Sequence, residues 1–154
     1  MRVVALMLRP WDPRDAGQLR PPLDDPAVRR STSPLPPHAW IASQTAEGRH
    51  AFAVLRDGAI AGHVVLKRPR PGQWEVGYWT AAHARRQGVA GWAVEQITGW
   101  AFARFAMASI ALIHDVDNLA SCAVARHCGY LLDAELPPHP SYPQPGHRHV
   151  RHRA

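Results

Sequence analysis

The chain has 154 residues, of which 46% are hydrophobic, with a formal net charge of +6. This length suits one domain with a substantial core, which we predict over residues 1–154. No segment approaches the roughly 20 consecutive apolar residues of a membrane helix, and MRVVALMLRPW is too short for a secretory signal, so we expect a cytoplasmic protein without a membrane partner. A basic nucleic-acid-binding module stays open as an alternative, but the cations are scattered rather than aligned along one helix, so we do not expect nucleic acid as a partner.

The first 48 residues carry the weakest pattern. The β-branched and aliphatic residues 2–9 predict a strand that Pro10 and Pro13 end. Residues 14–48 contain RPPLDDP and STSPLPPHAW. We therefore expect one or two short helices separated by a proline-rich loop, with residues 36–48 as the better helical candidate.

Residues 50–80 predict three consecutive antiparallel strands. Apolar runs lie on either side of Asp57 and Gly58. They indicate a β-hairpin, because an Asp-Gly pair readily adopts the positive φ values of a tight turn. The segment GQWEVGYWT, residues 72–80, predicts the third strand, and Pro69 and Pro71 mark the turn before it.

The hydrophobic period changes at residue 88. Small and aliphatic residues recur every three or four positions and predict a helix over residues 88–105. A strand over 108–114, a helix over 118–129 capped by Asn118, a strand over 130–136 and an edge strand within HVRHR follow. We predict an α/β fold with a mixed, largely antiparallel sheet flanked by helices, and a flexible basic tail at residues 139–154.

The segment AAHARRQGVAGWA, residues 81–93, has the composition of an anion-binding loop. It joins a predicted strand to a predicted helix, so the amides of residues 87–91 would lack helical acceptors. Small side chains there would let a ligand approach the backbone, and Arg85 and Arg86 add mobile positive charge. This geometry suits a diphosphate. A plain strand-to-helix turn with solvated arginines is the other interpretation.

Three motifs in order resemble the GNAT-type N-acetyltransferases. RRQGVA (residues 85–90) resembles the family's R/Q-x-x-G-x-G/A motif, EVGYWT (75–80) its splayed fourth strand, and DNLASCAVARHCGYLL (117–132) its N-x-x-S motif followed by G-F or G-Y. The similarity covers residues 50–135 well and the first 48 loosely, and is greatest to the branch that acetylates ribosomal-protein N-termini. It implies a sheet with a splayed central strand pair.

The function that this resemblance implies is transfer of the acetyl group of acetyl-CoA, as co-substrate, to a primary amine. The acceptor would be a protein N-terminus or a small-molecule amine, and the enzyme a monomer or homodimer. A catalytically weak CoA-binding protein of the same fold is an alternative.

The resemblance also assigns residues that bind the coenzyme. Its pantetheine arm would pair with the strand backbone, and its pyrophosphate with the loop. The expected residues are Gly77, Tyr78, Trp79, Thr80, Arg85, Arg86, Gln87, Gly88, Val89, Ala90, Gly91, Asn118 and Ser121. Asn118 as a mere helix cap and Ser121 as a small packed residue are the other interpretations.

Two residues are catalytic candidates. The resemblance places Ser121 near the thioester sulfur, whereas the tyrosine that often protonates the leaving thiolate is replaced by Ala125. Glu75 is the candidate general base, acting through a water, because strand alternation places it on the face of Gly77. An exposed strand carboxylate is the other interpretation. His63 and His114 are further candidate bases, with packing as their default role.

Histidines and cysteines raise the question of a metal site or a disulfide. Four histidines near the C-terminus have permissive spacings: His139, His147, His149 and His152. A flexible tail lacks the ordered ligands of a tight site, so we predict no metal. Cys122 and Cys128 would lie on different faces of one helix, so we expect no disulfide and a reducing compartment.

Overall fold

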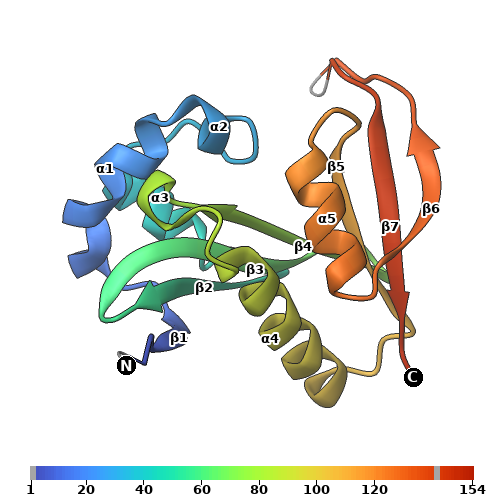
Figure 1. The fold of residues 1–154 in the computed structure, drawn as a ribbon, viewed down its shortest axis with the longest axis horizontal. Coiled ribbons are helices and arrows are strands. Elements are labelled where there is room, and N and C mark those ends of the chain that lie inside the picture. Colours follow the sequence, from blue (N-terminus) through green and yellow to red (C-terminus); the bar gives the residue numbers. More distant parts are fainter. Residues whose placement is uncertain (1–2, 141–142) are drawn as a thin grey trace.

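The computed structural model describes residues 3–140 and 143–154, in which seven strands form one sheet with helices on both faces (Figure 1). The strand order is β1-β2-β3-β4-β5-β7-β6, and each neighbouring pair is antiparallel except β4 and β5. The strands are β1 (Leu6–Pro10), β2 (Arg49–Arg56), β3 (Ala59–Arg70), β4 (Gln73–Thr80), β5 (Ser109–Asp115), β6 (Leu131–Leu136) and β7 (Gly146–His152). The predicted α/β fold with a mixed, largely antiparallel sheet is confirmed.

Five helices accompany these strands within the described residues. They are α1 (Ala16–Asp24), α2 (Pro26–Arg29), α3 (Pro37–Ser43), α4 (Val89–Arg104) and α5 (Leu119–His127), with short 3-10 turns at Pro13–Asp15 and Ala82–Ala84. The last two helices match their predicted ranges closely. The first strand is shorter than predicted, and residue 2 of its predicted range lies outside the described residues.

The segment before β2 holds three helices, where the sequence pattern predicts one or two. The side chain of Asp25 accounts for the additional helix. It accepts a hydrogen bond of 3.0 Å from the Ala27 N–H, and Pro26 occupies the first helical position. An aspartate cap followed by proline starts a new helix directly after α1 ends.

The β2–β3 hairpin forms as predicted. Asp57 and Gly58 have φ values of 50° and 84°, which a two-residue turn of this kind requires. The next turn differs: β3 continues to Arg70, so Pro69 lies within the strand, where the pairing register with β4 shifts. Because the ladder is irregular there, the missing N–H of proline costs little.

Two apolar cores lie on opposite faces of the sheet. Val76 of β4 belongs to the core beneath α4, which includes the 1% exposed Ile97. Trp79, three residues further along β4, belongs to the core beneath α1 and α3, which includes the fully buried Trp40. The side chains of a strand alternate between faces, so β4 contributes to both cores. Complete burial of a side chain such as Ile97 contributes about 1.5–3 kcal/mol.

The sheet is split between β4 and β5. These parallel strands pair only at Glu75 with Ala111 and at Val76 with Leu112. Beyond Val76, β4 stays paired with β3 on its other side, while β5 stays paired with β7 along its whole length. Figure 1 shows the two strands diverging, with β1–β4 in one half of the molecule and β5–β7 in the other. Residues 77–80 therefore have no strand partner on the β5 side.

The C-terminal strand β7 lies inside the sheet. It pairs with β5 on one side and β6 on the other, so Gly146–His152 of the predicted flexible tail belong to an ordered strand. The predicted edge strand is likewise an inner strand, and β6 takes the edge position. Residues 141–142 of the predicted tail lie outside the described residues. Among the described helices, none combines the length and the hydropathy of a membrane span.

Candidate active site

The loop between β4 and α4 leaves the first amides of α4 without helical acceptors. Gly88 caps the helix with a φ of 76°, a conformation that glycine adopts at little cost. The Trp92 N–H donates to the Gly88 carbonyl at 3.1 Å. The N–H groups of Val89, Ala90 and Gly91 precede this bond and have no acceptor within the helix, as at any helix N-terminus, a position that suits an anion.

The two arginines of this loop have different environments. Arg85 donates a 2.7 Å hydrogen bond to Asp25, so it ties the loop to the start of α2 and is not the mobile countercharge expected from the sequence. The hydrogen bond from the Ala27 N–H and then that from Arg85 keep the pKa of Asp25 below its usual value. Arg86 is exposed and has a φ of 60°. Arg86 is therefore the loop cation that can follow a bound anion.

In residues 77–80 of β4, the main chain is more available to a ligand than the side chains are. The Trp79 side chain is only 5% exposed and packs in the core. Gly77 lies against Lys67, so a Cβ at this position would sit 3.5 Å from the lysine Cε. These features suit a ligand that pairs with the strand backbone, because the strand has no β5 partner at these residues.

Tyr78 and Ser121 connect the two halves of the split sheet. The Tyr78 hydroxyl donates a 2.7 Å hydrogen bond to Ser121 Oγ, at the start of α5. Burial raises the pKa of Tyr78, and the hydrogen bond with Ser121 opposes this rise. Asn118 caps α5 by accepting from the Ser121 N–H at 3.0 Å, as the helix-cap interpretation predicts. Sequence reasoning placed Tyr78 on the coenzyme strand but missed its hydroxyl contact, since the two residues are 43 positions apart.

Glu75 and Ser121, the two predicted catalytic residues, are not in contact. Glu75 lies 3.4 Å from Lys67 as an ion pair, and both side chains are about one-quarter to one-third exposed (23% and 33%). Strand alternation places Glu75 and Tyr78 on opposite faces of β4, and Ser121 bonds to Tyr78. The Glu75 carboxylate and the Ser121 hydroxyl therefore lie on opposite faces of β4, near the split between β4 and β5.

The two histidines considered as bases are engaged elsewhere. His63 is 4% exposed and accepts a 3.0 Å hydrogen bond from the Trp11 indole N–H. Burial, and then the charges of Arg49 and Lys67, hold the pKa of His63 well below its usual value, so it is a neutral core residue. His114 bonds to His149, 2.9 Å away between the Nε2 atoms. Both contacts favour the packing role over general base catalysis.

Comparison with known proteins identifies the family. The model of an acetyltransferase (GNAT) domain matches residues 5–131, which include the loop, the split strands and α5. The chain belongs to the GNAT family. No curated protein matches the sequence significantly.

Solved GNAT structures share this fold at low sequence identity. A GNAT-family acetyltransferase from Bacillus anthracis is 14% identical, with a TM-score of 0.83 over 96% of this chain and 94% of its own. A putative ribosomal-protein-serine acetyltransferase from Vibrio cholerae is 18% identical, with a TM-score of 0.81 over 96% of this chain and 94% of its own. A ribosomal L7/L12 acetyltransferase, RimL, solved with coenzyme A, is 18% identical, with a TM-score of 0.80 over 96% of this chain and 93% of its own.

Proposed function

We propose that this chain is an N-acetyltransferase that moves the acetyl group of acetyl-CoA directly onto a primary amine. The observation that carries the proposal is the split between β4 and β5, where residues 77–80 have no strand partner beside the N-terminus of α4. A GNAT domain is an acetyl-CoA-dependent acyltransferase, and solved neighbours hold acetyl-CoA or coenzyme A.

The donor would occupy the two backbone features of the site. Its pantetheine arm would pair with the main chain of residues 77–80 as an added strand. Its pyrophosphate would accept from the amides of residues 87–91, where each charge near the helix N-terminus gains on the order of 0.3–1 kcal/mol. Arg86 would add the mobile positive charge, and Arg85 would hold the loop in place through Asp25.

The leaving thiolate would take its proton from Ser121. In this transfer the amine nitrogen bonds to the acetyl carbon, the carbon–sulfur bond breaks, and the sulfur keeps the electron pair. Because Ser121 accepts its hydrogen bond from Tyr78, its own hydrogen is free to point at the sulfur. As Ser121 gives up its proton, it would take the Tyr78 proton along their hydrogen bond, and Tyr78 would recover a proton from water, which receives the proton that the amine loses. This pair would replace the tyrosine whose usual place is taken by Ala125.

The acceptor amine would lose its proton on the opposite side of the split. Glu75 lies on that side of β4 and would act through a water, with Lys67 holding its carboxylate in place. An α-amino group has a pKa near 8 and a lysine one near 10.4, so a lysine costs about 3 kcal/mol more to deprotonate at neutral pH. A carboxylate base thus favours α-amino groups and other amines of low pKa.

The acceptor class is open between proteins and small molecules. The solved neighbours include a ribosomal L7/L12 acetyltransferase, an aminoglycoside acetyltransferase and a spermidine N-acetyltransferase. In this chain the acceptor side would be formed by α1–α3 and the proline-rich residues 34–37, which line a hollow with Arg20 and Asp24. We propose a cytoplasmic location, which suits two cysteines that are free thiols.

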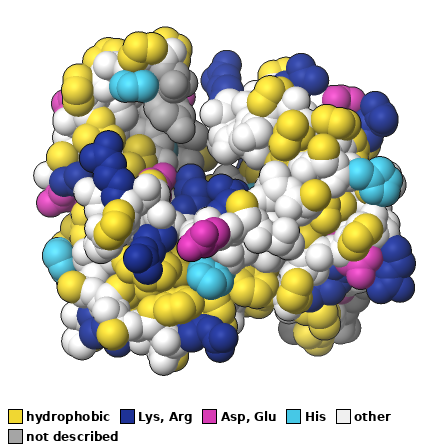
Figure 2. Space-filling model, turned by 180° about the vertical axis from the view of Figure 1, so that it is seen from behind, with side chains coloured by type: hydrophobic (Ala, Val, Ile, Leu, Met, Phe, Trp, Pro, Cys, Tyr) yellow, Lys and Arg dark blue, Asp and Glu magenta, His cyan; other side chains and the backbone are white. Residues whose placement is uncertain are grey.

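A catalytically weak CoA-binding protein is the second candidate. The ion pair of Glu75 with Lys67 favours it, because a paired carboxylate is a poorer base. Nucleic-acid binding has less support: on the face seen in Figure 2, Lys and Arg side chains are dispersed among apolar and acidic ones rather than gathered in a stripe.

An acceptor screen distinguishes the enzyme from the weak binder. Release of free thiol from acetyl-CoA would be followed with peptide N-termini, polyamines and aminoglycosides, against a blank of protein alone that corrects for Cys122. We expect at least one amine class to accelerate release, and mass spectrometry to find the product heavier by one acetyl group. Coenzyme binding without acceleration by any amine class would favour the weak binder.

A further inference from the structure

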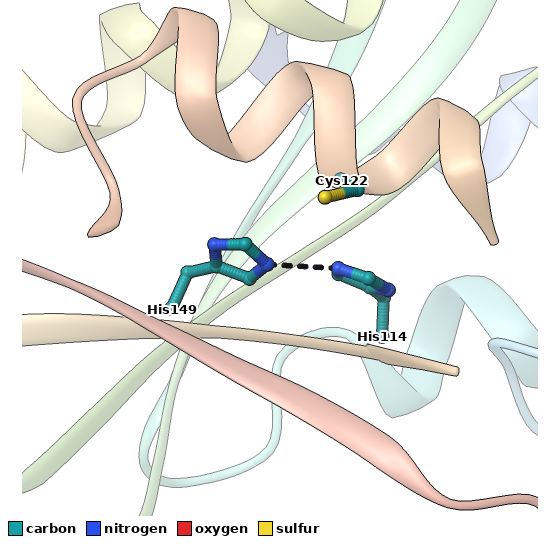
Figure 3. Close-up of side chains that lie close together, drawn as sticks. All are labelled: His114, Cys122 and His149. Carbon is teal, nitrogen blue, oxygen red and sulfur yellow. Dashed lines mark hydrogen bonds between the residues drawn. The ribbon is translucent and has the colours of Figure 1, made fainter. Parts of the chain in front are cut away.

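Three metal-ligating side chains converge outside the proposed transfer site. His114 comes from β5, His149 from β7 and Cys122 from α5, and Figure 3 shows the cysteine above the two facing rings. Their ligand atoms all lie within 4.8 Å of one another. His114 and His149 are 7% and 2% exposed and Cys122 is partly exposed, so the cysteine is the most accessible of the three.

The hydrogen-bond partners of the two histidines guide the assignment of their ring protons. His114 Nδ1 is 2.6 Å from the Asp115 carbonyl oxygen, and His149 Nδ1 is 3.3 Å from the Tyr130 carbonyl oxygen. A carbonyl oxygen can only accept, so we assign the tautomers that satisfy both contacts, with hydrogen on both Nδ1 atoms. In neutral imidazoles the two Nε2 atoms then present lone pairs to each other, at a separation of 2.9 Å.

Two facing lone pairs at this distance repel unless a cation lies between them. Moving one proton to Nε2 makes a hydrogen bond between the two rings, but it leaves a bare Nδ1 lone pair facing a carbonyl oxygen. Adding a proton to the pair would place a positive charge between two side chains that are only 7% and 2% exposed, where an unpaired charge is costly. A metal ion satisfies both lone pairs while each Nδ1–H stays bonded to its carbonyl, the arrangement typical of histidine ligands.

We propose that His114, His149 and Cys122 form a zinc site that fastens α5 to the β5–β7 pair. Two imidazoles and a thiolate are preferred zinc ligands, and a water would complete the tetrahedron. Ideal tetrahedral zinc sets the two nitrogens about 3.3 Å apart, so small rotations of the rings accommodate it. The guanidinium of Arg126 donates a hydrogen bond to Cys122 Sγ at 3.1 Å, so Cys122 Sγ is held at the start of α5 beside the two rings.

This site differs from one built on the C-terminal histidines alone. His149 contributes to it, but its partners come from β5 and α5, so it needs the folded sheet. It is independent of acetyl transfer, although Ser121 directly precedes Cys122 and would be held more firmly by the same ion. The cluster was not foreseen from the sequence, because His114 and His149 meet only through the β5–β7 pairing.

Metal titration of the untagged full chain tests the site. After chelator treatment, zinc would be titrated in competition with a chromophoric chelator, and cobalt would be added separately as a spectroscopic probe. We expect one zinc per chain and a thiolate-to-cobalt charge-transfer band. Cys122→Ser should remove the band and weaken zinc binding at least about 10- to 100-fold, the loss seen for even outer-shell partners.

Control variants separate this cluster from surface histidines. His152→Asn changes an exposed histidine on the same strand and should leave zinc affinity and the cobalt band unchanged. Zinc should also protect Cys122 from alkylation. Cys128 serves as an internal control that stays unreactive either way, because burial, and then Glu95, raise its pKa to about 11.

The proposal is overturned by any of three results. These are no stoichiometric zinc, equal zinc affinity in the parent and in Cys122→Ser, or a loss of binding in His152→Asn. Unfolding curves without metal check that Cys122→Ser folds like the parent. His114→Asn offers a second ligand removal and should weaken zinc binding as well.

Discussion

At the scale of single residues, the hydrogen bond between Tyr78 and Ser121 allows a direct test of the proposed proton donor in acetyl transfer. Ser121→Ala removes the proposed donor to the leaving thiolate. We expect kcat to fall about 100-fold, within the range typical of general acid catalysis, with little change in the KM for acetyl-CoA. Tyr78→Phe keeps the serine and should reduce kcat less, while costing about 1 kcal/mol of stability. Steady-state kinetics would refute this role for Ser121 if Ser121→Ala kept the parental kcat.

The buried carboxylate of Asp15 allows a prediction of how the stability of the fold depends on pH. Arg9 donates hydrogen bonds of 2.8 and 2.7 Å to Asp15, and these keep the pKa of Asp15 below its usual value. The stability they provide is therefore present above the unfolded-state pKa near 3.9 and is lost as the pH falls through the lower folded-state pKa. Asp15→Asn should cost about 2 kcal/mol at pH 7, a value that allows for solvent screening at Arg9.

Urea unfolding at pH 7 and pH 3 checks this prediction. The difference in unfolding free energy between the parent and Asp15→Asn should be smaller at pH 3, where the Asp15 carboxyl group is already protonated in the unfolded parent chain. Glu47→Gln alters an exposed carboxylate and should change stability by less than about 0.5 kcal/mol at either pH. An equal difference in unfolding free energy at both pH values would show that the charge of Asp15 is not the cause of its stabilising effect.

The residues that sequence reasoning placed well are those whose role depends on neighbours in the chain. The composition of the loop at Gly88 and the cap at Asn118 are local signals, and both lie where they were predicted. The Arg85–Asp25 ion pair and the facing pair of His114 and His149 join segments far apart in sequence. No periodicity encodes such contacts, which arise only when the sheet assembles.

At the scale of elements, Gly88, which caps α4, and Gly99, which lies within α4, have opposite expected effects on stability. Gly88 has a positive φ, so Gly88→Ala forces an alanine into a left-handed conformation at a cost of about 1–2 kcal/mol. Gly99 is exposed within the helix with nothing near its missing Cβ, so Gly99→Ala should stabilise by about 0.5–1 kcal/mol. Chemical denaturation measures both, and a stabilising Gly88→Ala would contradict the helix start described above.

The same two variants distinguish an effect on stability from an effect on acetyl-CoA binding. Gly88→Ala should weaken acetyl-CoA binding, because the amides that would hold its pyrophosphate follow this cap. Gly99→Ala lies more than two turns further along the helix and should leave the affinity unchanged. Equal affinity in both variants would place the pyrophosphate elsewhere.

Elements with a clear period were predicted within a few residues, and the errors have identifiable causes. Helices α4 and α5 and the β2–β3 hairpin follow from hydrophobic spacing, a cap and a turn dipeptide. Proline obscures α1 and α2: Pro21 and Pro22 lie inside α1, and the pattern of residues 14–48 predicts one or two short helices without fixing their positions. The prediction of an edge strand at HVRHR is wrong because strand order depends on long-range pairing, which a local pattern does not contain.

At the scale of the whole molecule, the split sheet links the fold to the proposed function. Within the described residues, the strands of the β1–β4 half pair with those of the β5–β7 half at Glu75 and Val76 alone. A ligand that pairs with residues 77–80 and also reaches α5 would bridge the two halves. We therefore expect acetyl-CoA to stabilise the complete fold, and not only one loop.

Thermal unfolding with and without acetyl-CoA tests this central claim most directly. Ligand at 100 times its Kd adds about 2.7 kcal/mol of stability, which corresponds to a rise in Tm of about 5–10 °C for a chain of this size. Coenzyme A should produce a similar rise, because it carries the same pantetheine arm and pyrophosphate. An unchanged Tm with both compounds would contradict the account of the site between β4 and β5.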